Sequence, residues 1–135
     1  MAVSFYLTLF AILYLGVIPM KVIDAITAGR ILRPGTNFTD DIIMEWLTTL
    51  DQELLTQSGE KVLRIYTDKN NDELFLPEPF SDAYKWYISA QMYLYDRDMD
   101  SYNNMILLFN TIIETFWRHN VTSRELNNEA VINIW

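Results

Sequence analysis

The 135-residue chain contains no cysteine, a single histidine, and only four glycines and four prolines. Without cysteine there is no disulfide, no thiolate metal ligand and no cysteine nucleophile. His119 alone supplies neither a histidine cluster for zinc nor a catalytic relay. The sequence also has no glycine-rich phosphate loop, so only carboxylate chemistry remains, and no pair of carboxylates is singled out. We therefore expect no enzyme, and we predict neither a cofactor nor a metal site.

Positive charge is also scarce, because ten Lys and Arg residues stand against eighteen Asp and Glu residues, for a net charge of −8. No run of basic residues occurs anywhere in the sequence. This balance argues against tight binding to a phosphate backbone, although contact with passing DNA stays possible. Half of the residues are hydrophobic and only 21% are charged. The body is therefore expected to fold as one domain with a single modest core.

The first 19 residues carry no charged side chain and differ sharply in composition from the rest of the chain. They form a poor signal peptide, since no basic residue opens them and no small-residue cleavage site precedes Met20. As a membrane anchor they would be short, with Lys21, Arg30 and Arg33 favouring a cytoplasmic body. The favoured interpretation is an over-extended start, because residues 15–17 can be encoded by a sequence close to a bacterial ribosome-binding site. A membrane is a partner only if residues 1–19 belong to the working protein.

Apolar residues at helical spacing predict an all-α fold, a small antiparallel bundle of about four helices within residues 20–119. A short first helix over residues 21–32 ends at Arg33-Pro34-Gly35. The second helix begins after Thr39 or Asp40 as its cap and ends at Gly59. An irregular loop or short hairpin is predicted for residues 60–79.

The two remaining helices are predicted over residues 81–95, with Ser81 as N-cap, and from Asp100 onward. The turn between them is short, so they should lie antiparallel. The last helix has the cleanest pattern, one wide apolar stripe formed by Tyr102, Met105, Ile106, Phe109, Ile112, Ile113, Phe116 and Trp117. Leu107 and Leu108 lie off this stripe. A helix with a second apolar side is either central in its own domain or packed against a second subunit.

Several polar residues near these stripes receive structural interpretations. Asp51 follows Leu50 and is interpreted as a solvated carboxylate. Gln91 lies on an apolar stripe and needs a partner if buried, either within the core or in a second subunit. Residues 96–100 lack the glycine and glutamate of a calcium loop and are interpreted as a solvated turn that caps the last helix. Arg118 and His119 are assigned to the far end of that helix, where positive charge is favourable.

After residue 119 the apolar pattern breaks, yet the chain finishes on apolar residues. They are Val131, Ile132, Ile134 and Trp135. This alternation predicts an extended, strand-like arm over residues 120–135 that docks on another surface. A tail that packs back on its own domain is the alternative.

A set of short motifs gives the sequence a family likeness over residues 20–120. The motif residues are Trp46, Leu47, Leu50, Asp51, Glu73, Leu74, Leu76, Pro77, Glu78, Pro79, Phe80, Tyr84, Tyr87, Ala90, Gln91, Tyr102, Asn103, Asn104, Phe109 and Asn110. In this order and spacing the chain resembles the small head-to-tail connector (adaptor) proteins of tailed bacteriophages, especially those of Gram-positive hosts.

The resemblance implies a structural virion protein rather than an enzyme, present in the host cytoplasm during assembly and then at the head–tail interface. Such proteins form a homo-oligomeric ring under the portal protein and connect it to a stopper or tail-completion protein. Double-stranded DNA passes through the ring without sequence recognition. The motif residues would supply the core and the interfaces, and Val131, Ile132, Ile134 and Trp135 would dock on the portal.

One feature departs from the family pattern, which includes no apolar leader. Family members that begin near Met20 would support a start at Met20 and weaken a membrane role. The competing interpretation is a small membrane-anchored helical interaction protein that uses residues 1–19 as its anchor.

Overall fold

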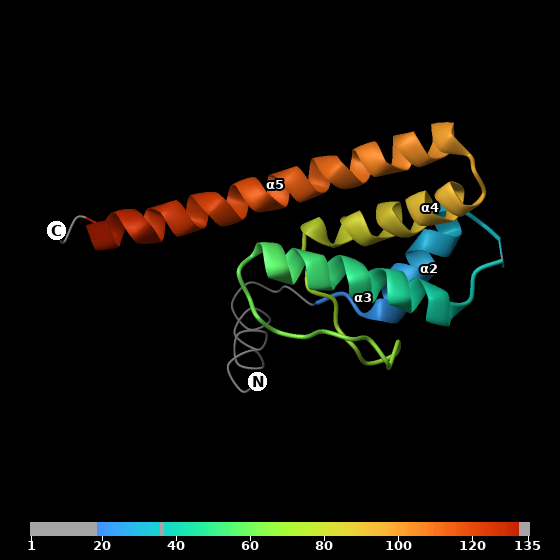
Figure 1. Ribbon diagram of the computed structural model, residues 1–135, viewed down its shortest axis with the longest axis horizontal. Helices are drawn as coiled ribbons and strands as arrows, with labels where there is room; N and C mark the ends of the chain where they lie inside the picture. Colours follow the sequence, from blue (N-terminus) through green and yellow to red (C-terminus); the bar gives the residue numbers. More distant parts are fainter. Residues whose placement is uncertain (1–18, 36, 133–135) are drawn as a thin grey trace.

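The computed structural model describes residues 19–35 and 37–132, with side chains described as far as residue 120 (Figure 1). These residues form four α-helices and no strand. The helices are α2 (Val22–Leu32), α3 (Asp40–Gln57), α4 (Ala83–Tyr95) and α5 (Met99–Ile132), with the short 3₁₀ turn η1 (Phe80–Asp82) before α4. The predicted all-α bundle is confirmed. No helix among these residues is both long and apolar enough to cross a membrane. The leader over residues 1–18 lies outside the described part of the chain.

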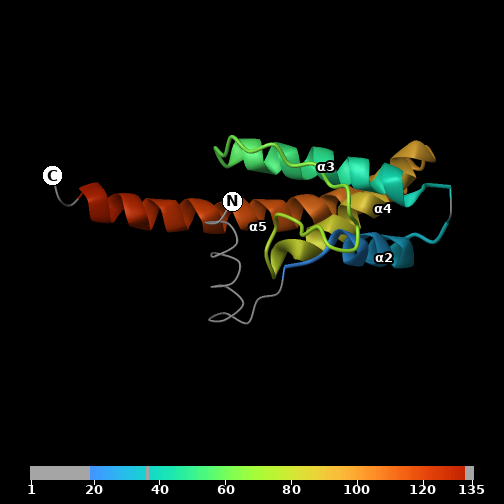
Figure 2. The same ribbon diagram turned by 90° about the horizontal axis from the view of Figure 1, so that it is seen from below.

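Helix α4 is central in the bundle. It packs against α5 on one side and against α2 and α3 on the other, while η1 contacts both α4 and α5. Figures 1 and 2 show α5 running antiparallel to α4, with α3 and the loop that follows it on the far side of α4. The backbones of α3 and α5 are therefore not in contact within the described residues.

The contact between α2 and α4 depends on Gly29. A Cβ atom at this position would lie 2.6 Å from Ile88 Cγ2, closer than packed carbon atoms approach. The hydroxyl of Ser89 also donates to the Gly29 carbonyl at 3.4 Å. Only glycine allows the two helices to approach this closely, and Val22, Ala25 and Ile26 are buried beside it.

The ends of α3 follow the sequence prediction. Thr39 is the N-cap, and its hydroxyl accepts a hydrogen bond from the Ile42 amide at 3.3 Å. At the other end Gly59 adopts a left-handed φ of +86°, which ends the helix at little steric cost. Ile43, Leu47, Leu50 and Leu54 recur at helical spacing and are buried on one side of α3.

The first helical turn of α3 is also held by charge. Asp40 accepts from Arg30 of α2 at 2.6 Å and from Lys69 of the following loop at 2.7 Å. These two cations hold the pKa of the Asp40 carboxyl below its ordinary value. The cluster connects α2, α3 and the loop after α3. At the same C-terminal end of α2, the C-cap residue Arg33 pairs with Asp96 in the turn after α4.

Residues 60–79 form an irregular loop rather than a hairpin. Its only ladder-like contact among the described residues is an isolated antiparallel bridge between Lys21 and Glu73. In this bridge the Leu74 amide donates to the Met20 carbonyl at 2.9 Å. The prediction that Ser81 is the N-cap of α4 is wrong. Ser81 lies within η1, where its hydroxyl donates to the Glu78 carboxylate at 2.8 Å.

Helix α5 confirms the apolar stripe. Phe109 and Phe116 are buried and the other stripe residues are half-buried, whereas Leu107 and Leu108 are 64% and 42% exposed. The turn before α5 caps it as predicted, because the Asp98 carboxylate accepts from the Ser101 amide and hydroxyl at 3.2 and 2.8 Å.

The predicted end of the last helix is wrong. Helix α5 continues to Ile132, so its C-terminal part extends well beyond α4 (Figure 1). The strand-like arm predicted from residue 120 is therefore helical up to Ile132. His119 lies inside α5 against the ring of Phe80, at 6.0 Å between centroids, and not at a helix end. The sequence between Met99 and Ile132 contains no Gly or Pro, which explains why nothing interrupts the helix.

Candidate interaction surfaces

A buried carboxylate joins three separate motifs of the sequence. Asp51 of α3 is fully buried, and its Oδ1 accepts from the Tyr84 hydroxyl of α4 at 2.7 Å. Its Oδ2 accepts from the Phe75 amide at 3.1 Å and from the Tyr66 hydroxyl. Tyr84 Oη in turn accepts from the Leu76 amide at 2.7 Å. The interpretation of Asp51 as a solvated carboxylate is wrong.

The donors around Asp51 suit an ionised carboxylate, because all three donate and none accepts. Burial is the largest influence and raises the pKa of the Asp51 carboxyl, while the hydrogen bonds from Tyr66 and Tyr84 oppose that rise. Burial and the neighbouring carboxylate also raise the pKa of Tyr66 and Tyr84. Because Asp51 is fully buried, the network connects α3, α4 and the loop inside the core.

The motif residues divide between the core and the surface. Leu47, Leu50, Leu74, Tyr84 and Phe109 are buried, while Trp46, Phe80, Tyr87, Gln91 and Tyr102 are half-buried. Pro77, Pro79, Asn103, Asn104 and Asn110 are exposed. Gln91 makes no hydrogen bond within the described residues. The motifs thus converge on one core and leave an asparagine-rich side of α5 open.

The side chains predicted to dock on the portal all lie outside those that the structure describes. Val131 and Ile132 belong to α5, so a strand-like geometry is wrong for these two residues. Ile134 and Trp135 lie outside the described residues. Docking of this end stays a prediction.

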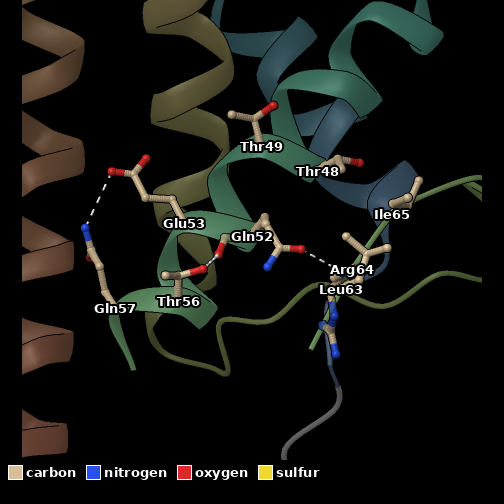
Figure 3. Close-up of a pocket in the computed structure, with 9 residues that line it drawn as sticks. All are labelled: Thr48, Thr49, Gln52, Glu53, Thr56, Gln57, Leu63, Arg64 and Ile65. Carbon is tan, nitrogen blue, oxygen red and sulfur yellow. Dashed lines mark hydrogen bonds between the residues drawn. The ribbon is translucent and has the colours of Figure 1, made fainter. Parts of the chain in front are cut away.

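A groove of about 460 Å³ lies between the outer side of α3 and the extended residues 62–66 (Figure 3). Gln52 connects the two walls, because its amide nitrogen donates to the Val62 carbonyl at 3.0 Å and its oxygen accepts from the Arg64 amide at 2.8 Å. Thr48 accepts from the Tyr66 amide at 3.1 Å. Gln52 and Thr48 are one helical turn apart, and the residues that they bind, 64 and 66, are two residues apart in extended backbone. These two distances are similar, so the loop can run alongside the helix.

The outer wall of this groove is apolar and open to solvent. Val62 is 51% exposed, Leu63 78% and Ile65 59%. The backbone amides and carbonyls of Leu63 and Ile65 form no hydrogen bond with any described residue. The α3 wall of the groove is formed by Thr48, Thr49, Gln52, Glu53, Thr56 and Gln57. Glu53 on this wall and Arg64 on the opposite wall are the only charged residues that line the groove. Sequence reasoning assigned these residues no role; the signal was three apolar residues between polar neighbours.

The outer side of α5 has a similar character. Its exposed positions between residues 103 and 115 are Asn103, Asn104, Leu107, Leu108, Asn110, Thr111, Glu114 and Thr115. Glu114 is the single charged residue among them, in a chain that is 21% charged. Depletion of charge with exposed apolar side chains is the compositional mark of the centre of a protein interface.

No three His, Asp or Glu side chains among the described residues converge to hold a metal ion. The groove beside α3 and the outer side of α5 are instead suited to contacts with protein.

Comparison of the chain with protein-family models, with curated proteins and with solved structures finds no match.

Proposed function

We propose that the protein is a structural head-to-tail connector of a tailed bacteriophage, which assembles as a ring beneath the portal and leads the DNA channel on to a stopper or tail-completion protein. The observation that carries this proposal is the meeting of three family-like motifs at Asp51. The segments around Leu50, Leu74 and Tyr84 are far apart in the sequence, yet one hydrogen-bond network connects them. Their spacing therefore serves one compact arrangement, which supports the resemblance.

Two further features agree with a structural role in an assembly. Helix α5 and the groove beside α3 leave apolar side chains exposed that a lone small domain does not need. The net charge of −8 lets DNA pass through a ring without adhering, because phosphates and carboxylates repel each other. No catalytic residue and no cofactor enter this function.

The test uses the full chain and a version that begins at Met20, each produced with the portal protein encoded by the same phage or prophage. We expect either version to copurify with portal-containing procapsids, and imaging of the vertex to show added density below the portal. Particles without the protein would contradict the proposal. If a lipid fraction retained the full chain and not the Met20 version, the membrane-anchored interaction protein would replace it.

A further inference from the structure

Two open surfaces of this chain lie on different sides of the bundle. The first, called here the ridge, is the outer side of α5 around Leu107 and Leu108. The second is the groove between α3 and residues 62–66. Helix α4 separates them, since α5 contacts α4 and η1 but not α3. In Figure 1, α5 and the loop after α3 border the bundle on opposite sides.

We infer that the ridge of one copy packs into the groove of the next copy, which makes the contact between subunits heterologous. This inference rests on the proposed ring and identifies its subunit interface. A ring requires two different surfaces on each subunit, whereas a two-fold dimer uses one surface twice. The ridge and the groove supply two such surfaces with matching chemistry.

The matching chemistry begins with the apolar side chains. Leu107 and Leu108 lie off the stripe that packs against α4 and are 64% and 42% exposed, so much of their apolar surface stays in contact with water. Leu63 and Ile65 form an open apolar wall in the same way. Burial of two such pairs removes apolar surface from water on both copies, which is the main favourable contribution to association.

The polar residues of the two surfaces match as well. Asn104 and Thr111 flank the leucines of the ridge, and Thr49 and Thr56 lie on the groove wall. Uncharged polar side chains lose less on burial than charged ones and can form hydrogen bonds across an interface. Charge is sparse on both surfaces, since the ridge has Glu114 alone and the groove has one residue of each sign, Glu53 and Arg64.

Cysteine cross-linking tests this arrangement directly, because the chain has no cysteine of its own. We expect the double variant Leu63→Cys with Leu107→Cys to give a ladder of dimers, trimers and larger species with a short bismaleimide. A mixture of the two single variants should give dimers only. The matched control is Leu107→Cys with Ile31→Cys, since Ile31 of α2 is 73% exposed and lies outside both surfaces. The ladder should exceed this control several-fold; equal yields would overturn the inference.

A second experiment separates a heterologous contact from a two-fold one. Leu63→Asp and Leu107→Asp should each remain monomeric at high concentration in analytical ultracentrifugation, while the wild-type chain and Ile31→Asp associate. Mixed in equal amounts, the two variants should stop at a dimer. The intact ridge of Leu63→Asp packs into the intact groove of Leu107→Asp, and only the two disrupted surfaces are left open. Assembly of Leu63→Asp alone, a mixture that stays monomeric, or a monomeric wild-type chain without cross-links would each overturn the inference. Added density at the portal vertex in any of these cases would leave the proposed function standing.

Discussion

Residues 62–65 and residues 66–76 are neighbours in the loop after α3, yet they relate to the bundle in opposite ways. In the second stretch, Tyr66, Leu74 and Leu76 are buried. Three of its hydrogen bonds belong to the buried network, because Tyr66 and Phe75 donate to Asp51 and the Leu76 amide donates to Tyr84. In the first stretch the apolar side chains point to solvent and Gln52 is the main attachment. A buried carboxylate holds one half of the loop, whereas two hydrogen bonds of the half-buried Gln52 side chain hold the other.

This difference indicates that the two halves serve different purposes. The half at Asp51 contributes to the free energy of unfolding of the isolated chain. The half beside Gln52 contributes little to that free energy and keeps its apolar side chains for contact with another molecule. The contrast can be broken or sharpened by the substitutions that follow.

The largest expected effect comes from Asp51→Ala. It leaves two tyrosine hydroxyls and the Phe75 amide without an acceptor, so the free energy of unfolding should fall by about 4 kcal/mol. Asp51→Asn keeps one oxygen but places an NH₂ group against a donor, and should cost about 2 kcal/mol. Urea unfolding at pH 7 measures both. A loss below about 1 kcal/mol for Asp51→Ala would show that the network does not anchor the loop.

Tyr84→Phe and Tyr66→Phe come next and should differ from each other. Tyr84 donates to Asp51 and accepts from the Leu76 amide, so its loss removes two buried bonds, at about 3 kcal/mol. Tyr66 gives Asp51 one bond and should cost about 2 kcal/mol. The same urea titration ranks the two variants. The reverse order would mean that the contact of α4 with the loop is less important than the loop's own tyrosine.

Gln52→Ala tests the weakly held half. The side chain is half-buried and makes two bonds to residues 62–64, so the global cost should be about 1 kcal/mol. Amide hydrogen exchange should rise at Arg64 and not at Phe75. Leu63→Ser is the matched control, with a change within about 0.5 kcal/mol because its side chain is exposed. Faster exchange at Phe75 would mean that the two halves open as one unit.

The smallest effect is a pH dependence of opposite sign at two carboxylates. The pKa of Asp51 is raised above 3.8. The difference in free energy of unfolding between the wild-type chain and Asp51→Asn should therefore favour the wild type most below pH 3.8, and this advantage should decrease as pH rises through the raised pKa. The pKa of Asp40 is lowered, so stability relative to Asp40→Asn should be present above pH 3.8 and be lost as pH falls through that lowered pKa. Solvent screening keeps the Asp40 effect below about 1 kcal/mol. Thermal unfolding between pH 3 and 7 would contradict this if both differences had the same sign.

Local periodicity was enough to predict the helices and their buried sides. The stripe of α5 is buried or half-buried against the bundle, whereas Leu107 and Leu108 lie off the stripe and are exposed. Thr39 and Gly59 set the ends of α3 through local backbone chemistry, which a sequence displays directly. The end of α5 was misjudged because polarity was given more weight than the absence of any helix-breaking residue.

The Asp51 network could not be predicted in the same way. Its partners Tyr66, Phe75 and Tyr84 are 15, 24 and 33 residues away, so only the folded chain brings them together. One local signal was available, because Asp51 shares the buried side of α3 with Leu47 and Leu54. The exposed groove wall was missed for a different reason. An apolar residue in a loop is assumed to be buried somewhere, and its exposure shows only in three dimensions.

The length of α5 turns a small hinge movement into a large displacement. Its 34 residues span about 51 Å, and the three-residue turn after α4 lies at one end of that span. A swing of about 10° at the turn would carry the far tip through about 9 Å. The ion pair between Arg33 and Asp96 braces this pivot. The position of the C-terminal end of α5 therefore depends on the Arg33–Asp96 ion pair near its N-terminal end.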